Sequence, residues 1–469
     1  MTFTYVRRCE LPVPADEAFA WHAREGAFER LLPPWEGATV VRRSGGIRDG
    51  AETVIDMHIG PVPVRWQALH FGYVEGEQFC DRQVTGPFAF WEHTHRFLPG
   101  GASSCTLEDR IEYQPPLGRL GALLGRRAIE HKLIRMFNYR HAVTRADLAD
   151  HARYRDQPRL RVGVTGSSGL VGSALTAFLT TGGHQVVRLK RVDSLPTTSP
   201  SSSHPPAAVT EGSWHVESGQ LSVPGDQPLD AVIHLAGESI AAGRWTAAQK
   251  QRIRDSRVLA TRRLAEALAA KSHRPTTLIC ASAVGIYGDR GDETLDETSP
   301  AGDGFLAEVC RQWEAVAQPA RDAGIRVVHP RFGMILSPAG GALANLLTPF
   351  RLGGGGPVGK GQQIWSWVAL DDVLGAVNHA LLNEQLSGPV NVVSPHAVSS
   401  RQFARTLGRV LHRPAILPLP VAAARLALGE MADELLLASA HVLPRRLIDT
   451  GYRFRFADLE AALRHQLGR

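Results

Sequence analysis

The chain has 469 residues, of which 43% are hydrophobic and 21% charged, and its formal net charge is +6. This length exceeds what one hydrophobic core usually supports, so we expect two or more domains. The small excess of Lys and Arg is scattered, which argues against a nucleic-acid-binding surface. The five cysteines are isolated and form no CxxC pair, which argues against a disulfide framework or a cysteine zinc site.

The sequence predicts no membrane span. The first eight residues, Met1–Arg8, lack the apolar run that follows the charges of a signal peptide. Nowhere does the chain reach the run of about 18 uncharged apolar residues that a spanning helix needs. A cytoplasmic location is the resulting expectation.

Residues 1–150 are predicted to form one α+β domain. A strand over Phe3–Leu11 is followed by a helix over Ala18–Leu32, which Pro33 and Pro34 end. A last helix is predicted over Leu120–Asp150, where apolar residues recur at helical spacing. Between the helices, Gly and Pro turns separate six strand-like segments, at residues 39–42, 51–59, 64–74, 79–86, 89–98 and 105–113.

An early helix, an antiparallel sheet and a long final helix make up the helix-grip plan. The segments Val84–Phe97, Leu107–Tyr113 and Pro115–Gly118 resemble the SRPBCC superfamily of START-like ligand-binding domains. This resemblance implies an apolar ligand, held in a cavity between the sheet and the last helix. The motifs do not specify which ligand that is.

His93 and His95 are two residues apart on a predicted strand, so they share one face. Such a pair can belong to a metal site, but the neighbouring sequence offers no convincing further ligands. Alternating polar residues are more typical of a solvated face, so we expect a solvated face here and no metal. The nearby aromatic residues are expected in the core: Trp66, Phe88, Phe90 and Trp91.

Residues 151–159 are polar and without apolar periodicity, which predicts an interdomain linker. The second domain is expected over residues 160–400. A C-terminal segment, residues 401–469, is expected to pack beside it on the substrate side.

A glycine motif opens this second domain. The buried strand Val162–Val164 leads into a turn with Gly166, Gly169 and Gly172, and a helical pattern follows. Strand, glycine turn and helix together are the context of a dinucleotide-binding site. In that site the first glycine allows the tight turn, the second lets the backbone approach a pyrophosphate, and the third lets the helix pack closely. The backbone N–H groups and the helix dipole then face the phosphates. We expect cofactor contacts from Gly166, Ser167, Ser168, Gly169, Leu170, Val171 and Gly172.

The end of the second predicted strand, His184–Arg191, indicates which dinucleotide binds. A strand of the NAD type carries an acidic residue there, which bonds the ribose 2′-hydroxyl. This strand instead ends in basic residues, among them Arg191, which suit a 2′-phosphate and favour NADP over NAD. Asp193 keeps NAD as an alternative, and a merely solvated strand end is another. The Pro- and Ser-rich residues 194–207 are expected to form a flexible surface insertion.

The rest of the domain alternates strands and helices. The strand in Leu229–Gly237 ends in small residues, so Leu235, Ala236 and Gly237 are expected along the cofactor. A helix is predicted over residues 246–270 and further strands over 277–282 and 326–332. This alternation predicts an α/β fold with a parallel, doubly wound Rossmann sheet.

At these residues the chain resembles the extended and atypical short-chain dehydrogenase/reductase families. More narrowly it resembles an uncharacterised epimerase-like subfamily, sometimes labelled nucleoside-diphosphate-sugar epimerase or cell-division inhibitor. The motifs that carry this second resemblance are Leu235–Ile240, Gly243–Thr246, Asp255–Val258, Ser282–Gly288, Phe305–Glu314 and Gly451–Phe456. It implies an NAD(P)-binding domain with a small α/β substrate segment at the C-terminal end.

The resemblance places Ser282 where active members have a serine that orients the substrate oxygen and contacts the cofactor. Those members also use a Tyr four residues before a Lys for proton transfer. Counted back from Glu314, these two positions hold Leu306 and Cys310, so the pair is absent. Tyr287 and Glu238 are the candidate catalytic substitutes.

Three functions remain open from the sequence. The first is an NADP-dependent oxidoreductase or epimerase acting on a small substrate such as a nucleotide sugar. The second is a non-catalytic NADP(H)-binding sensor or scaffold whose first domain binds an apolar ligand. A third, in which the first domain delivers an apolar substrate to the second, rests only on the fusion of the two domains. The oligomeric state is not indicated.

Overall fold

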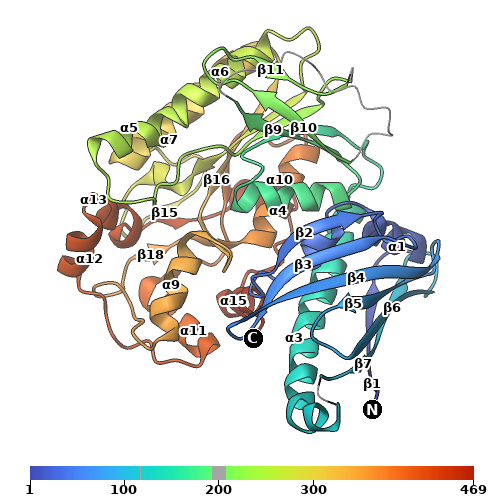
Figure 1. Cartoon of the computed structure of the whole chain (residues 1–469). Coiled ribbons are helices and arrows are strands. Elements are labelled where there is room, and N and C mark those ends of the chain that lie inside the picture. Colours follow the sequence, from blue (N-terminus) through green and yellow to red (C-terminus); the bar gives the residue numbers. More distant parts are fainter. Residues whose placement is uncertain (117, 193–207, 226) are drawn as a thin grey trace. The chain divides into compact units, whose positions relative to one another are not determined.

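The computed structural model describes the chain except for residues 117, 193–207 and 226 (Figure 1). Asp193 and the expected insertion at 194–207 therefore lie outside the described residues. The chain divides into two compact units. The first, here called the helix-grip unit, is Met1–Pro158 with Ala177–Gly183 and Gly468. The second, here called the Rossmann unit, is Arg159–Thr176, His184–Leu467 and Arg469. In the part of the chain that is described, no helix is long and apolar enough to cross a membrane.

The helix-grip unit contains one antiparallel sheet and three helices. Its elements are β1 (Phe3–Leu11), α1 (Ala15–Ala23), α2 (Ala27–Leu31), β2 (Thr39–Ser44), β3 (Glu52–Ile59), β4 (Val62–Val74), β5 (Gln78–Thr85), β6 (Phe90–Pro99), β7 (Cys105–Gln114) and α3 (Gly118–Ala152). The seven strands lie in the order β1-β7-β6-β5-β4-β3-β2. The predicted α+β helix-grip fold is thereby confirmed.

One predicted helix of this unit is in fact two. The backbone of Gly26 has φ of +90°, a left-handed conformation that residues with a side chain rarely adopt. The chain therefore leaves α1 after Ala23 and re-enters a helix at Ala27. The apolar spacing continues across this break, which explains why periodicity alone predicted a single helix.

Helix α3 packs on the sheet through Leu133, Phe137 and Leu148, which are all nearly inaccessible to solvent. The expectation of a solvated face at His93 and His95 is wrong, because their side chains are only 4% and 12% exposed. Their neighbours on the same face are aspartates and aromatic rings rather than water.

The Rossmann unit is built on a nine-stranded sheet. Its elements are β8 (Arg161–Thr165), α4 (Leu170–Thr181), β9 (Gln185–Arg191), β10 (Val209–Trp214), β11 (Leu221–Ser222), β12 (Ala231–His234), α5 (Ala247–Asp255), α6 (Val258–Ala269), β13 (Thr277–Cys280), β14 (Ser282–Ala283), η1 (Val284–Tyr287), α7 (Phe305–Ala315), α8 (Gln318–Asp322), β16 (Arg326–Phe332), α10 (Leu370–Leu382) and β20 (Gly388–Val392).

Strands β10, β9, β8, β12, β13 and β16 lie side by side and parallel, and β20 pairs with the far side of β16. In chain order this is the arrangement 3-2-1-4-5-6-7, which confirms the predicted doubly wound fold. The strand order reverses between β8 and β12. Ligands of such sheets bind at the carboxyl ends of the strands around this reversal.

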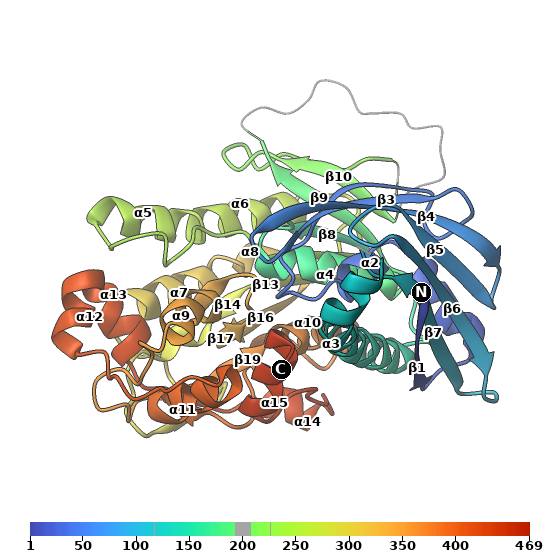
Figure 2. The ribbon, with the colours of Figure 1, turned by 60° about the horizontal axis from the view of Figure 1, so that its bottom comes forward.

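Helices cover both faces of the sheet (Figures 1 and 2). Leu264 and Leu268 of α6, Trp313 of α7 and Ala320 of α8 pack in one core with Val232 and Leu278 of the sheet. Helix α10, buried along nearly its whole length, packs against β13 and β16. Burial on both faces explains why β8, β12 and β13 consist almost entirely of buried residues.

The Rossmann unit contains further elements beside the sheet and helices given above. They are β15 (Thr294–Leu295), β17 (Met334–Leu336), α9 (Gly341–Arg351), β18 (Ile364–Trp365), β19 (Trp367–Ala369), β21 (Val398–Ser399), α11 (Ser400–Leu411), α12 (Val421–Leu428), α13 (Glu430–Ala432), η2 (Asp433–Leu437), β22 (His441–Val442), α14 (Arg445–Asp449) and α15 (Leu459–Leu467). Leu347 of α9, Phe403 of α11 and Leu463 of α15 share one hydrophobic core.

Candidate cofactor site and active site

The glycine turn lies between β8 and α4, at the strand reversal of the sheet. Gly166 has φ of +68°, and its carbonyl accepts a hydrogen bond of 3.0 Å from the Gly169 N–H, which closes the turn. Ser168 and Gly169 are exposed at its tip, whereas Ser167 is buried. Leu170 and Val171 form the first turn of α4, so their N–H groups belong to the positive end of the helix dipole.

The three glycines differ in the space around them. A Cβ on Gly166 would lie 2.7 Å from the Leu235 carbonyl carbon, and one on Gly172 would lie 2.1 Å from the Gly166 oxygen. A Cβ on Gly169 would come no nearer to any described atom than 3.3 Å, again at the Gly166 oxygen. Gly166 and Gly172 are thus required by the fold itself, whereas Gly169 keeps an exposed surface clear. The turn Gly166–Gly172, here called the cradle, thus has the open backbone surface that a bound pyrophosphate requires.

The end of β12 forms the neighbouring wall of the cradle. The Leu235 N–H donates to the Thr165 carbonyl at 3.2 Å, which brings Leu235 and Ala236 beside the turn. Gly237 follows, and a Cβ there would lie 3.3 Å from the Arg257 guanidinium. Arg257 in turn donates to the Glu238 carbonyl at 2.9 Å. The structure therefore brings together the predicted turn and the predicted strand end.

Three basic residues lie at the end of β9. Lys190 forms a 2.6 Å ion pair with Glu211 on β10. Arg191 is exposed, and no described residue pairs with it. Arg188 is half-buried, and its buried Nε has no hydrogen-bond partner among the described residues. Arg188 and Arg191 are therefore the two cations available to a phosphate here, and Lys190 is less so.

Ser282 lies at the carboxyl end of the sheet, on β14 opposite Arg331 of β16. Its hydroxyl donates a 2.7 Å hydrogen bond to Glu314 Oε1. Arg331 donates two hydrogen bonds of 2.8 Å to the same carboxylate. The side chains of Arg331 and Glu314 are 8% and 14% exposed, and Arg331 holds the pKa of Glu314 below its usual value although burial opposes this. Glu314 thus remains ionised and fixes the serine hydroxyl.

Tyr287, at the end of η1, lies wholly in the interior. Its hydroxyl accepts a 2.9 Å hydrogen bond from Arg331 and donates to Asn391 Oδ1 at 2.8 Å. Asn391 is opposite Arg331 in the sheet register. Burial raises the pKa of Tyr287, and Arg331 opposes this rise only in part. The phenol is therefore neutral and has its hydrogen bonds within the protein.

The positions of the absent Tyr–Lys pair lie on α7. Leu306 is buried against Gly285, and Cys310 lies in an apolar cluster with Ile286 and Tyr287. Burial raises the pKa of the Cys310 thiol to about 12, so it is protonated and inert near neutral pH. The helix that would carry the pair instead presents an apolar surface, with Glu314 as its polar residue toward Ser282.

Glu238 lies beyond the end of β12 and is half-buried. Its N–H donates to Ser256 Oγ at 2.9 Å, and this bond and the one from Arg257 fix its backbone. Among the described residues, no hydrogen bond links Glu238 to the Ser282 cluster. The catalytic candidates thus fall into two groups, one around Ser282 and one at Glu238.

Sequence reasoning missed the residues that support Ser282. Arg331 and Asn391 are buried polar residues in the parallel strands β16 and β20, and polar residues within such buried strands were a usable signal. Their partnership with Glu314 is a long-range contact that no local pattern specifies. A second missed residue is Arg257, whose place beside Gly237 depends on the packing of α6.

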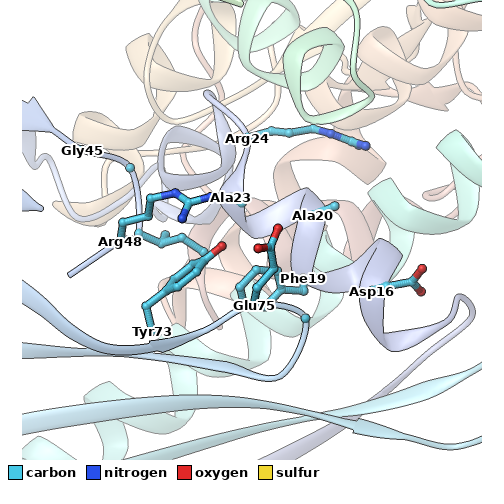
Figure 3. A pocket seen from close by; sticks show the side chains of 12 residues that line it. Asp16, Phe19, Ala20, Ala23, Arg24, Gly45, Arg48, Tyr73 and Glu75 are labelled. Carbon is cyan, nitrogen blue, oxygen red and sulfur yellow. The ribbon is translucent and has the colours of Figure 1, made fainter.

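The helix-grip unit has a pocket of about 450 Å³ between α1 and two turns of the sheet (Figure 3). Figure 3 shows Phe19, Tyr73 and Glu75 facing one space, with Arg48 beside them. The Arg48 guanidinium lies 4.8 Å from the centre of the Tyr73 ring. The lining mixes aromatic and charged groups and lies at α1, whereas the expected cavity is apolar and lies between the sheet and the last helix.

Three family models match successive parts of the chain. Residues 11–137 match the polyketide cyclase/dehydrase and lipid transport family, residues 162–393 the NAD dependent epimerase/dehydratase family, and residues 419–466 a domain of unknown function. An epimerase family protein of Mycobacterium bovis is 41% identical over 302 residues, which cover 64% of this chain and 96% of that protein. The epimerase family protein YfhF of Bacillus subtilis is 38% identical over 307 residues, 65% of this chain and 97% of that protein.

Solved structures show the same relationship. A crystal structure described as the nucleoside-diphosphate sugar epimerase from Corynebacterium glutamicum is 34% identical, has a TM-score of 0.75, and covers 100% of this chain and 90% of its own. The structure of human epimerase family protein SDR39U1 (isoform 2) with NADPH is 33% identical, with a TM-score of 0.57 over 66% of this chain and 99% of its own. Both sequence resemblances are thereby confirmed. The chain belongs to the epimerase family, with an SRPBCC-like helix-grip domain at its N-terminal end.

Proposed function

We propose that the Rossmann unit binds NADP(H) and is an epimerase-like oxidoreductase acting on a small substrate such as a nucleotide sugar. The observation that carries the proposal is the open cradle at Gly169 beside the basic end of β9. The NADPH of the human relative supports it, since that relative is 33% identical to this chain.

The cofactor's two phosphate groups would have different partners. The turn Gly166–Gly172 would hold the pyrophosphate through backbone N–H groups, with Leu235, Ala236 and Gly237 along its side. Arg191 and Arg188 would hold the 2′-phosphate, whose recognition by arginine distinguishes NADP from NAD.

A bound nicotinamide would supply or accept the hydride. Ser282 donates its hydroxyl proton to Glu314, so it would accept a hydrogen bond from a hydroxyl group of the substrate. Arg331 and Tyr287 would act as positioning residues, because both are enclosed by protein contacts. Glu238, half-buried beyond the end of β12, would be the carboxyl group that exchanges a proton.

Titration with NADPH and with NADH tests the cofactor assignment. Arg191→Ala is expected to lower the affinity for NADPH at least about 10-fold and to leave the affinity for NADH unchanged, since only NADPH carries the 2′-phosphate. Lys190→Ala is the matched control, because Lys190 is engaged by Glu211. Equal affinities for the two nucleotides in the native protein would refute the NADP assignment.

A reaction is tested by following nicotinamide absorbance with a panel of nucleotide sugars. Ser282→Ala is expected to lower kcat about 100-fold or more for any substrate found, with NADPH affinity retained. An exposed serine such as Ser218 provides the control substitution. Turnover that survives Ser282→Ala unchanged would overturn this site.

A second candidate function is favoured by one observation. Leu306 and the protonated Cys310 occupy the positions of the proton-transfer pair, which is the arrangement expected of a cofactor-binding protein without turnover. In that case the chain would sense or store NADP(H). Tight NADPH binding with no turnover across the substrate panel would support this second function over the first.

A further inference from the structure

A row of histidine and aspartate side chains crosses the sheet of the helix-grip unit. Asp81 on β5 is directly opposite His93 on β6, and His95 on β6 is opposite Asp109 on β7. His141 reaches the same row from α3, where its Nε2 lies 2.5 Å from Asp109 Oδ2. Directly paired residues of adjacent strands share a face, so these side chains converge beneath α3.

Asp81, His93 and His95 have the geometry of a ligand set. Asp81 Oδ2 lies 3.3 Å from His93 Nδ1 and 3.8 Å from His95 Nε2. One ligand atom from each residue lies within 4.8 Å of those of the other two. Donors around a tetrahedral ion with bonds of 2.0–2.2 Å are about 3.4 Å apart. The trio therefore needs little movement to share one ion.

The second nitrogen of each imidazole faces Asp109. His93 Nε2 lies 3.0 Å and His95 Nδ1 2.7 Å from Asp109 Oδ1. Metal-bound histidines usually direct their remaining N–H to such a carboxylate, which fixes the ring orientation. His141 holds the other oxygen of Asp109. Asp109 is thus hydrogen-bonded to the His93 ring, whereas His95 Nδ1 lies near it without a hydrogen bond of acceptable geometry.

The protein encloses this trio of side chains. The side chains of His93 and Asp109 are 4% and 2% exposed, and Asp81 and His95 only slightly more. The Phe79 ring stacks on His95 with centroids 4.2 Å apart, and Phe137 meets His93 edge-on at 5.5 Å. Although burial lowers the pKa of His93, the nearby Asp109 and Asp81 raise it to about 9, so a divalent ion would displace a proton from this imidazole on binding.

We propose that Asp81, His93 and His95 bind a divalent transition-metal ion, with Asp109 and His141 as positioning residues. Imidazole nitrogen with carboxylate oxygen suits Zn²⁺, Co²⁺ or Fe²⁺ rather than Mg²⁺ or Ca²⁺. Three protein ligands leave a coordination position for water or a ligand, as in catalytic rather than structural sites. This site lies in the helix-grip unit and is independent of the NADP proposal.

The test titrates the chelator-treated full-length protein with Co²⁺, followed by visible absorption and calorimetry. One Co²⁺ per chain is expected, with the ligand-field bands of four- or five-coordinate cobalt, displaced by Zn²⁺. Asp81→Asn and His95→Gln are each expected to weaken binding at least about 10-fold. His58→Gln, an exposed histidine on β3, is the matched control and should bind as the native protein does.

The proposal is overturned if the native protein shows no stoichiometric binding, or if Asp81→Asn and His95→Gln both bind with native affinity. Circular dichroism of the metal-free variants shows whether they are folded. X-ray absorption at the cobalt edge of the native protein gives a measurement that needs no variant. An edge spectrum without imidazole ligation would refute the site, and one with two imidazoles would support it.

Discussion

At the scale of single residues, a substitution at Gly169 should change cofactor affinity without changing the stability of the fold. Because a Cβ there meets only the Gly166 oxygen, at 3.3 Å, Gly169→Ala is expected to fold normally. The added methyl group would occupy the approach of the pyrophosphate, so NADPH affinity should fall at least about 10-fold. Fluorescence titration with NADPH, together with the thermal unfolding midpoint, checks both expectations.

Gly172→Ala is the contrasting variant at the same turn. Its Cβ would lie 2.1 Å from the Gly166 oxygen, so the turn itself must move and thermal stability should fall as well. If Gly169→Ala bound NADPH as tightly as the native protein, the cradle would not hold the pyrophosphate. A loss of stability in Gly169→Ala equal to that of Gly172→Ala would contradict the open space at this glycine.

At the scale of elements, Glu434 of η2 caps the beginning of α7. Its carboxylate accepts hydrogen bonds of 2.7 and 2.8 Å from the N–H groups of Phe305 and Leu306. Removing such a cap costs about 1 kcal/mol, with a further contribution from the helix dipole. Glu434→Ala is therefore expected to lower the free energy of unfolding by about 1–2 kcal/mol in urea denaturation.

Glu308→Ala, also in the first turn of α7 but paired at the surface with Arg311, serves as the control and should change stability by less than about 0.5 kcal/mol. Glu434→Gln should fall between the native protein and Glu434→Ala, because it keeps one acceptor oxygen and loses the charge. Equal stability of Glu434→Ala and the native protein would contradict the capping role.

Local sequence patterns predicted most helices and strands, but they did not predict the hydrogen bonds between residues that are far apart in the sequence. The predicted strands over Phe3–Leu11 and over residues 326–332 coincide with β1 and β16. Asp371 and Asp372 lie in the first turn of α10, whose N-cap is Ala369. Asp372 accepts hydrogen bonds from the N–H groups of Arg455 and Phe456. Those partners are far away in sequence, so no local signal indicated them.

The same distinction applies to the candidate site. The glycine turn is a local motif, and its place at the strand reversal follows from the parallel topology. The support of Ser282 joins β14, α7, β16 and β20 through Glu314, Arg331 and Asn391. Such a cluster depends on packing across the sheet, which the sequence does not reveal without an alignment of relatives.

For the molecule as a whole, histidines that are buried in the neutral form make the free energy of unfolding depend on pH. His329 on β16 accepts a 2.6 Å hydrogen bond at Nε2 from Arg321, and its Nδ1 faces the Cys280 carbonyl at 3.3 Å. Burial lowers the pKa of His329 to about 4. The unfolded chain, with a histidine pKa near about 6.5, therefore binds more protons than the folded protein between these values.

Stability must consequently fall as the pH falls from about 6.5 toward 4, and His329 alone should account for about 2 kcal/mol at pH 5. Burial raises the pKa of Asp372 to about 6, which acts in the opposite direction, so the native curve alone does not isolate the histidine. His329→Gln keeps an acceptor for Arg321 and cannot titrate. The free energy of unfolding in urea is measured for both proteins from pH 8 to pH 5. Over this range it should fall by about 2 kcal/mol more in the native protein than in the variant, because the contributions of other groups cancel. Parallel losses in the two proteins would mean that His329 is not held neutral in the fold.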